Sequence, residues 1–451
     1  MRLRSILGGL AIVLAGGLAG GLVGGRTATP PERAGEQLGT YTHILNLVQE
    51  RAAGEVNPSE AIEASIRGML RSLDPHSNYL DPDDYRHMME EQQGSFSGLG
   101  IVIWKPSHDL PLTVISPLEG TPAWEAGIRA GDVISQIEGV DTLDMSIEDA
   151  LRKLKGPKGT RVTITVTRPG DEAPLTFTIT RDNIPTNSIR VAFMIQPSVG
   201  YIRLESFTRT SDSELGERIR DLEKQGMRRL VLDLRQNPGG LLEQAVRVAG
   251  RFLKKEQLIV YTQGRIRDSE QEYRSNGTGS RVEMPLVVLV DKFSASASEI
   301  VAGALQDHDR ALIVGQTTWG KGLVQTVYPL SHGAALALTT ARYYTPSGRS
   351  IQAKGITPDI IVEEPGSPEA RLREADLQRH LDNEQSKKGA PAKPRAKPVA
   401  PATATPVEPP KPIELGSKDD FQLQQAIAFL KGEPFKGEPS KAVAQNSART
   451  N

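Results

Sequence analysis

The feature that most constrains the fold is an alternation of apolar and amphipathic segments between Val199 and Val362. Short apolar runs such as RLVLDL and PLVVLV alternate with segments whose apolar residues recur every three or four positions. This pattern is typical of a parallel sheet covered by helices, with ligands bound at loops leaving the strand ends. We predict strands over 200–204, 229–234, 285–290 and 311–314, and helices over 212–225, 241–253 and 299–306.

Composition excludes several classes of protein. The chain has 451 residues, enough for two or three domains, and carries 54 basic and 55 acidic side chains. That balance argues against a nucleic-acid-binding protein, which would show a clustered basic excess. The absence of cysteine excludes disulfides, thiolate nucleophiles and cysteine-ligated zinc. Because no HExxH motif or metal-spaced carboxylate pair occurs either, we expect no metal and no organic cofactor.

The first 26 residues have the pattern of an export signal. Arg2 and Arg4 precede an apolar run from Ile6 to Val23, and the first acidic residue is Glu32. The run approaches the length of about 20 residues that spans a bilayer, and no clear A-x-A cleavage site follows it. We therefore predict an exported protein of the periplasm or cell envelope, with residues 1–26 either cleaved or retained as an inner-membrane anchor.

Helical segments are predicted near both ends of the chain. Asn57, Pro58 and Glu60 form a helix start within a helical region at 34–93, for which we expect a partner surface and self-association into a homo-oligomer. Residues 366–412 are predicted to be a partly disordered linker, and its stretch over 390–412, rich in Pro, Ala and Lys, is incompatible with helix or sheet. In the last segment, 413–451, Asp419–Lys431 has helical spacing and is expected to dock on the protein.

Residues 94–184 read as a compact, mostly β module. Glycine turns separate short strands and two small helices, and Arg161–Arg168 (RVTITVTR) alternates as a strand. The order of elements resembles a PDZ domain. The resemblance implies that the backbone of a Gly-Φ-Gly-Φ loop binds a peptide's terminal carboxylate while the peptide adds a strand to the sheet. The matching residues are Gly98, Leu99, Gly100 and Ile101.

Three loops of the alternating region carry candidate chemistry: Gln236–Gly240 (QNPGG), Phe293–Glu299 (FSASASE) and Gly320–Gln325 (GKGLVQ). Paired glycines let backbone N–H groups approach a developing negative oxygen, although a tight turn also explains them. A serine at a helix start is either a cap or a nucleophile helped by the helix dipole. A lysine between glycines in an uncharged run is either a surface residue or a dehydrated general base.

The base for such a serine is more plausibly a lysine than a histidine. His308 lies twelve residues after Ser296 along a predicted helix, about 18 Å away, and is better placed as the helix end. Lys321 is the only charge between Ala311 and Ser331, and Gln325 follows it by four residues. The run from Gly315 to Lys321 also fits GxxxxGK, but Gly322 stands where a nucleotide-binding loop needs Ser or Thr, and a strand-like segment follows.

Together these loops and the preceding module resemble the carboxyl-terminal processing peptidases, or tail-specific proteases, over about residues 35–362. The most specific match is SASASEIVAGALQDHDRALIVGQTTWGKGLVQ, Ser294 to Gln325. The resemblance implies a crotonase-like βαβ core, Ser296 as nucleophile, Lys321 as base 25 residues later and Gln325 as the residue orienting the lysine. The implied oxyanion-hole amides are those of Ala297 and of Gly239 or Gly240. The resemblance also implies that Arg168 senses bound peptide. A solvent-facing arginine without that role is an equally good account of the residue.

We therefore predict an α/β (α+β overall) serine endopeptidase with a Ser–Lys dyad, its core at 185–365 and an inserted PDZ domain at 94–184. Its partners are expected to be proteins or peptides with free C-terminal tails, delivered directly or by an adaptor protein, and not nucleic acid. A non-catalytic peptide-binding scaffold with an inactive core is the alternative, because both readings predict tail binding and only the enzyme predicts acylation of Ser296.

Overall fold

The computed structural model describes residues 31–107, 110–277, 281–363, 373–385, 416–436 and 438–439. It divides into two compact units, Met1–Ser72 and Leu73–Asn451. The segment predicted as export signal and the linker at 390–412 lie outside the described residues. Within the described ranges, no helix combines the length and the apolar character that crossing a membrane requires.

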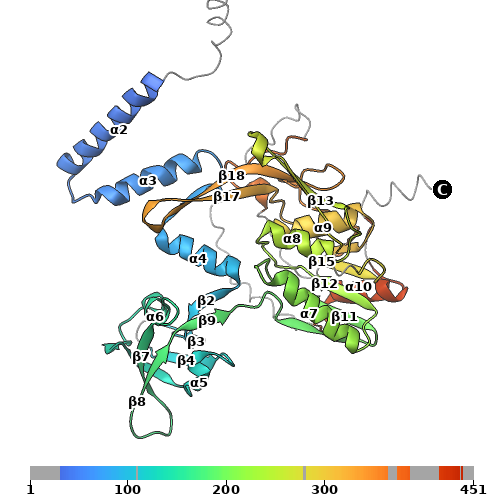
Figure 1. The fold of residues 1–451 in the computed structure, drawn as a ribbon, viewed down its shortest axis with the longest axis horizontal. Helices are drawn as coiled ribbons and strands as arrows, with labels where there is room; N and C mark the ends of the chain where they lie inside the picture. The colour runs from blue at the N-terminus through green and yellow to red at the C-terminus, as the bar shows by residue number, and fades with distance from the viewer. Residues whose placement is uncertain are drawn as a thin grey trace, which may run out of the picture. The chain divides into compact units, whose positions relative to one another are not determined.

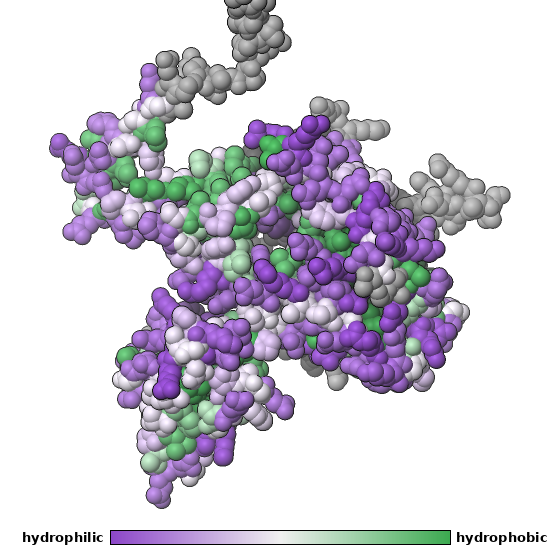
Figure 2. All heavy atoms as spheres, viewed as in Figure 1, coloured by the Kyte–Doolittle hydropathy of each residue, from purple (hydrophilic) through white to green (hydrophobic). Residues whose placement is uncertain are grey.

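The first unit is formed by helices α2 (Pro31–Arg51) and α3 (Pro58–Arg71) (Figure 1). The predicted start of α3 is confirmed, because the Asn57 side chain accepts a hydrogen bond from the Ser59 N–H and Pro58 occupies the first turn. Apolar side chains of both helices reach the surface, as Figure 2 shows. Among the exposed ones are Leu38, Ile44, Leu47 and Met69. Self-association through these helices remains a prediction.

The second unit begins with β1 (Asn78–Leu80) and α4 (Pro82–Gln93), which lead into the β-rich module. That module comprises β2 (Ser95–Gly98), β3 (Ile101–Trp104), β4 (Leu112–Pro117), α5 (Pro122–Glu125), β5 (Val133–Ile137), β6 (Val140–Asp141), α6 (Ile147–Leu154), β7 (Arg161–Thr167), β8 (Leu175–Thr180) and β9 (Asp182–Pro185). Its main sheet has the order β3-β4-β5-β7-β8, while β2 pairs with β9. Alternate residues of β7, Val162, Ile164 and Val166, are fully buried, as the predicted strand requires.

The predicted parallel sheet is confirmed. Strands β11 (Val199–Arg203), β12 (Arg229–Asp233), β15 (Leu286–Val290), β16 (Leu312–Gly315) and β19 (Ile360–Ile361) are parallel, with β10 (Val191–Gln196) and β20 (Glu438–Pro439) antiparallel at the edges. Each face of this sheet is covered by helices. Leu230 and Leu232 pack in one core with α7 (Ser211–Lys224), α8 (Leu242–Gly250) and α9 (Ala297–Asp307), whereas Val231 packs with α10 (Phe421–Lys431) on the other face.

The C-terminal helix α10 docks as expected. Leu423 and Ile427 are buried against the parallel sheet, in the same cluster as Val231. At the start of α10, Asp420 accepts two hydrogen bonds from the Arg235 guanidinium, 2.9 and 2.7 Å long. Arg235 is also paired with Asp233, the last residue of β12, so α10 is attached to the strand that leads into the Gln236–Gly240 loop.

A second sheet was not predicted from the sequence, apart from the strand character of residues 323–330. Its order is β1-β18-β13-β14, and β17 also pairs with β18. The strands are antiparallel: β13 (Leu258–Gly264), β14 (Gln271–Arg274), β17 (Leu323–Pro329) and β18 (Ala335–Tyr344). β1 and β17 pair with the same residues of β18, Ala335 to Ala337, and so lie on its two opposite edges.

Candidate active site

The three loops singled out in the sequence leave the carboxyl ends of three adjacent strands. Gln236–Gly240 follows β12, Phe293–Ser296 follows β15, and the loop to Lys321 follows β16. These strands pair in the order β12-β15-β16. Parallel neighbours end at the same edge of a sheet, so the loops meet where ligands of such sheets bind.

The glycine loop and the serine loop are joined by buried hydrogen bonds. The Asn237 carbonyl accepts from the Ala295 N–H and from the Ser298 hydroxyl, each at 3.0 Å, and the Ser294 hydroxyl donates to the Leu234 carbonyl at 2.8 Å. Ser294 and Ser298 are both fully buried, and both hydroxyls are used to hold these loops. Ser296 differs from them because its side chain is only half-buried.

Ser296 adopts a backbone conformation that is unusual for a residue other than glycine. Its φ is +52°, immediately before α9 begins at Ala297. The sharp turn from strand to helix is stabilised by a hydrogen bond from the Ser296 N–H to Glu299 Oε2, 2.8 Å long. The first amides of a helix lack an intrahelical acceptor, so the Ala297 N–H can stabilise negative charge next to the serine.

The paired glycines lie against Ser296. A Cβ added to Gly239, whose φ is +104°, would lie 2.9 Å from the Ser296 Cβ and 3.0 Å from the Ala297 nitrogen. Only glycine therefore fits at 239. The Gly239 N–H donates to Asn237 Oδ1 at 2.9 Å, whereas no acceptor for the Gly240 N–H occurs in the described part of the chain. The choice between Gly239 and Gly240 as oxyanion-hole donor stays a prediction.

Lys321 occupies a dehydrated position between β16 and β17. Burial lowers the pKa of its amine, although the carboxylates of Glu374, Glu299 and Asp74 act to raise it. Lys321 Nζ lies 3.5 Å from Gln325 Oε1. The Gln325 amide is fixed by a 2.6 Å hydrogen bond from Nε2 to the carbonyl of His76, so its oxygen is directed to the lysine.

The Ser296 loop and the Lys321 loop share a hydrogen-bond acceptor, but within the described structure the Ser296 hydroxyl and the Lys321 amine are not hydrogen-bonded to each other. Glu299 Oε2 lies 2.8 Å from the Ser296 nitrogen and 2.9 Å from the Lys321 nitrogen, so the sum of these distances limits the separation of the two backbones. No hydrogen bond joins the Ser296 hydroxyl to Lys321 Nζ among the described residues. Catalytic hydrogen bonds of free enzymes commonly tighten only when substrate binds.

Several residues around the lysine were not identified from the sequence. Glu374 is fully buried and accepts hydrogen bonds from His76 Nε2 at 2.8 Å and from Gln352 Nε2 at 2.9 Å. Burial acts to raise the Glu374 pKa, but these hydrogen bonds outweigh it and hold the pKa below its usual value. Because His76 and Glu374 are 298 residues apart, no local pattern indicates their pairing.

The predicted peptide-binding loop connects β2 to β3. Gly100 has a φ of +77°, and β3 is an edge strand of the main sheet of the module, open to an added strand. Arg168 is not solvent-facing, so that alternative is wrong: its side chain is 13% exposed and paired with Asp132 at 2.7 Å. It also donates to the Gly127 carbonyl. Its role in sensing peptide remains a prediction.

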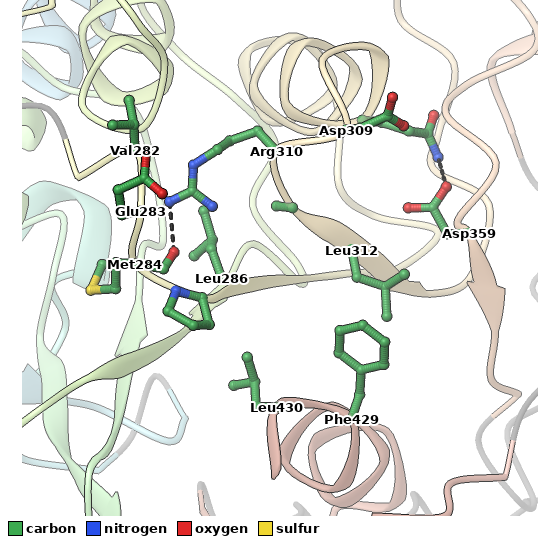
Figure 3. Close-up of a pocket in the computed structure, with 13 residues that line it drawn as sticks. Val282, Glu283, Met284, Leu286, Asp309, Arg310, Leu312, Asp359, Phe429 and Leu430 are labelled. Atoms are coloured by element: carbon green, nitrogen blue, oxygen red, sulfur yellow. Dashed lines mark hydrogen bonds between the residues drawn. The ribbon is translucent and has the colours of Figure 1, made fainter. Parts of the chain in front are cut away.

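A separate pocket of about 490 Å³ lies at the opposite ends of β15 and β16 and contains none of the candidate catalytic residues (Figure 3). Leu286, Leu312 and Leu430 contribute apolar side chains to it. The Arg310 guanidinium turns to the protein backbone there and donates to the Met284 carbonyl at 2.7 Å. The three candidate loops therefore lie at the other ends of these strands.

Comparison with known proteins agrees with this arrangement. The model of Peptidase family S41 matches residues 198–362, and that of the PDZ domain matches residues 113–168. The carboxy-terminal-processing protease of Bartonella bacilliformis is 40% identical over 421 residues, covering 90% of this chain and 92% of that protein. The chain belongs to the carboxy-terminal processing proteases. The family resemblance and fold class predicted from the sequence are confirmed.

Other members of this serine-type family are similar over shorter lengths. The carboxyl-terminal-processing protease of Synechocystis sp. is 40% identical over 310 residues, covering 68% of this chain and 72% of that protein. The solved structure of a photosystem II D1 C-terminal processing protease is 31% identical and covers 71% of this chain and 86% of that one, with a TM-score of 0.41.

Proposed function

We propose that this carboxy-terminal processing protease is a Ser–Lys endopeptidase that acts on the C-terminal tails of exported proteins. Ser296 is the nucleophile, Lys321 the general base, and Gln325 the residue that positions the lysine. The amides of Ala297 and of Gly239 or Gly240 form the oxyanion hole. Neither a metal nor an organic cofactor takes part in these steps.

One observation carries the proposal: a dehydrated lysine lies next to an oriented glutamine, in a loop that shares an acceptor with the half-buried serine. Burial lowers the Lys321 pKa, which favours the neutral amine that a base requires. Gln325 Oε1 is held towards the amine by the hydrogen bond from its Nε2 to His76. A scaffold without activity has no physical need for a lysine in such a position.

The reaction follows from these roles. Neutral Lys321 takes the proton of the Ser296 hydroxyl as Oγ attacks the peptide carbonyl carbon, and backbone amides stabilise the oxyanion. The intermediate collapses as its C–N bond breaks, and the Lys321 ammonium protonates the leaving amine. Water then attacks the ester, giving a proton to Lys321, and the second collapse returns that proton to Ser296.

The PDZ module supplies the preference for tails. A free C-terminal carboxylate binds the backbone at Gly98–Ile101, and the preceding residues extend the sheet along β3. We propose that the substrates are proteins of the periplasm or cell envelope, in accord with the export pattern of residues 1–26. Direct binding by the PDZ module and delivery by an adaptor are both compatible with this chemistry.

The experiment is N-terminal sequencing of fragments released from an unfolded, tailed substrate. Wild-type protein is expected to cut the substrate, whereas Ser296→Ala and Lys321→Ala each abolish cleavage and still bind the tail. The control variants are Ser294→Ala and Ser298→Ala, which remove serines from the same loop and are expected to retain turnover to the extent that they fold. Full activity of Ser296→Ala would overturn the proposal, and inactivity of the wild type on every tailed substrate would favour the scaffold.

A further inference from the structure

The buried carboxylate of Glu299 accepts hydrogen bonds from both the Ser296 loop and the Lys321 loop. Its Oε2 accepts from the Ser296 N–H and the Lys321 N–H, at 2.8 and 2.9 Å. Its Oε1 accepts from the Gly320 N–H at 2.7 Å and from the Thr318 hydroxyl at 2.5 Å. The side chain is fully buried in the first turn of α9.

We propose that Glu299 is a positioning residue for peptide-bond hydrolysis, fixing the Ser296 turn and the Gly320–Lys321 turn to one carboxylate. The inference rests on the function proposed above. Four donors meet the two oxygens, and three of them are backbone N–H groups, which can only donate. These hydrogen bonds lower the pKa of Glu299, but burial outweighs them and raises it to about 7.

The geometry explains why a shared acceptor is needed. Ser296 is held at a positive φ directly after a loop, and Lys321 lies between two glycines that permit many backbone conformations. The Ser296 carbonyl accepts the first helical hydrogen bond of α9, from the Ile300 N–H, but neither the Ser296 N–H nor the Lys321 N–H has a backbone acceptor in the described part of the chain. Because both turns donate to the same carboxylate, a shift of one loop relative to the other breaks a buried hydrogen bond.

The charge of Glu299 by itself acts against the reaction. Its carboxylate, like those of Glu374 and Asp74, raises the Lys321 pKa and so disfavours the neutral amine. If electrostatics were its only effect, removing the charge would raise activity at neutral pH. A positioning role predicts the opposite sign, because Glu299→Gln must direct an NH₂ group at one pair of donors and leave a backbone amide without an acceptor.

The test compares three variants of the full chain. Glu299→Gln is expected to lower kcat about 100-fold or more, because small displacements of reacting groups have effects of that size. KM for a tailed peptide is expected to stay within about threefold, because the PDZ module is remote in sequence and intact. Thr318→Val keeps the three backbone amides that donate to Glu299 and removes one hydroxyl donor, together with the acceptor of the Ile356 N–H. Its kcat is expected to lie between those of wild type and Glu299→Gln.

The matched control is Glu214→Gln. Glu214 also accepts hydrogen bonds from a backbone amide, that of Ile189 at 3.0 Å, and from the Ser188 hydroxyl at 3.1 Å. Its replacement is expected to lower thermal stability and leave kcat unchanged. Circular dichroism and tail-peptide binding establish that each variant is folded.

The outcomes separate this inference from the proposed function. A folded Glu299→Gln variant with wild-type kcat, in an enzyme that Ser296→Ala inactivates, overturns the positioning role alone. A rise of kcat at neutral pH overturns it too, since it assigns Glu299 a purely electrostatic effect. If Ser296→Ala is fully active, the proposed function fails and this inference fails with it. If Glu299→Gln does not fold, Thr318→Val decides: wild-type kcat in that variant overturns the role.

Discussion

Replacing Asp420 by alanine is expected to release the C-terminal helix from the sheet. The change removes two charge-assisted hydrogen bonds from Arg235, 2.9 and 2.7 Å long, and the side-chain acceptor of the Leu423 N–H at the start of α10. The Arg235 side chain is only 10% exposed, so water replaces little of what is lost. Asp233 still neutralises the guanidinium.

The magnitude follows from these contacts. Hydrogen bonds to charged groups contribute about 1.5–3 kcal/mol each and a helix cap about 1 kcal/mol, which together give about 4–7 kcal/mol. Because Asp233 still neutralises the Arg235 guanidinium, a loss towards the lower end, about 3–5 kcal/mol, is expected. This agrees with the range for breaking one partner of a buried ion pair. Since about 1.4 kcal/mol corresponds to a factor of ten, amide protection in α10 should fall by about 10² to 10⁴.

Hydrogen exchange measured by mass spectrometry on peptides spanning Phe421–Lys431 reads out this loss directly. Asp419→Ala is the matched control, because Asp419 is the neighbouring aspartate and is exposed, so a change within about 0.5 kcal/mol is expected. Equal protection in Asp420→Ala and Asp419→Ala would refute the reasoning, since it would mean that the buried ion pair contributes nothing to docking.

Two further predictions concern the lysine and the peptide-binding loop. Glu374→Gln removes an anion that raises the Lys321 pKa, so the neutral amine persists to lower pH and the acid limb of the kcat/KM profile should move to lower pH; a move to higher pH would contradict this. Gly100→Ala places a Cβ 2.4 Å from Thr121 and should weaken binding of a fluorescent tail peptide at least tenfold. The control Gly120→Ala has open space around its Cβ and should have a smaller effect. Equal affinities of the two variants would contradict this prediction.

The elements that the sequence predicted are those governed by local pattern. The strands over 229–234 and 285–290 and the helix at Asp419–Lys431 follow from short apolar runs and helical spacing, and all three are present as β12, β15 and α10. The three candidate loops could also be expected to meet, because parallel topology brings strand ends together. The spacing of 25 residues between Ser296 and Lys321 came from a family resemblance and not from periodicity.

What the sequence did not indicate depends on contacts between distant segments. His76 orients Gln325 and pairs with Glu374, although these residues come from three separate parts of the chain. Glu299 lies on the buried side of a helix start, where a capping role would be the ordinary interpretation. Its contacts with Gly320 and Lys321 exist only because β15 and β16 are neighbours.

The most direct test of the account is to locate the acyl group formed during turnover. A peptide ester substrate is mixed with enzyme, quenched in acid within milliseconds, and digested for peptide mapping by mass spectrometry. The account predicts an acyl adduct on Ser296 in the wild type, an adduct that forms more slowly in Lys321→Ala, and none in Ser296→Ala. An adduct on any other residue, or undiminished hydrolysis by Ser296→Ala, would contradict it.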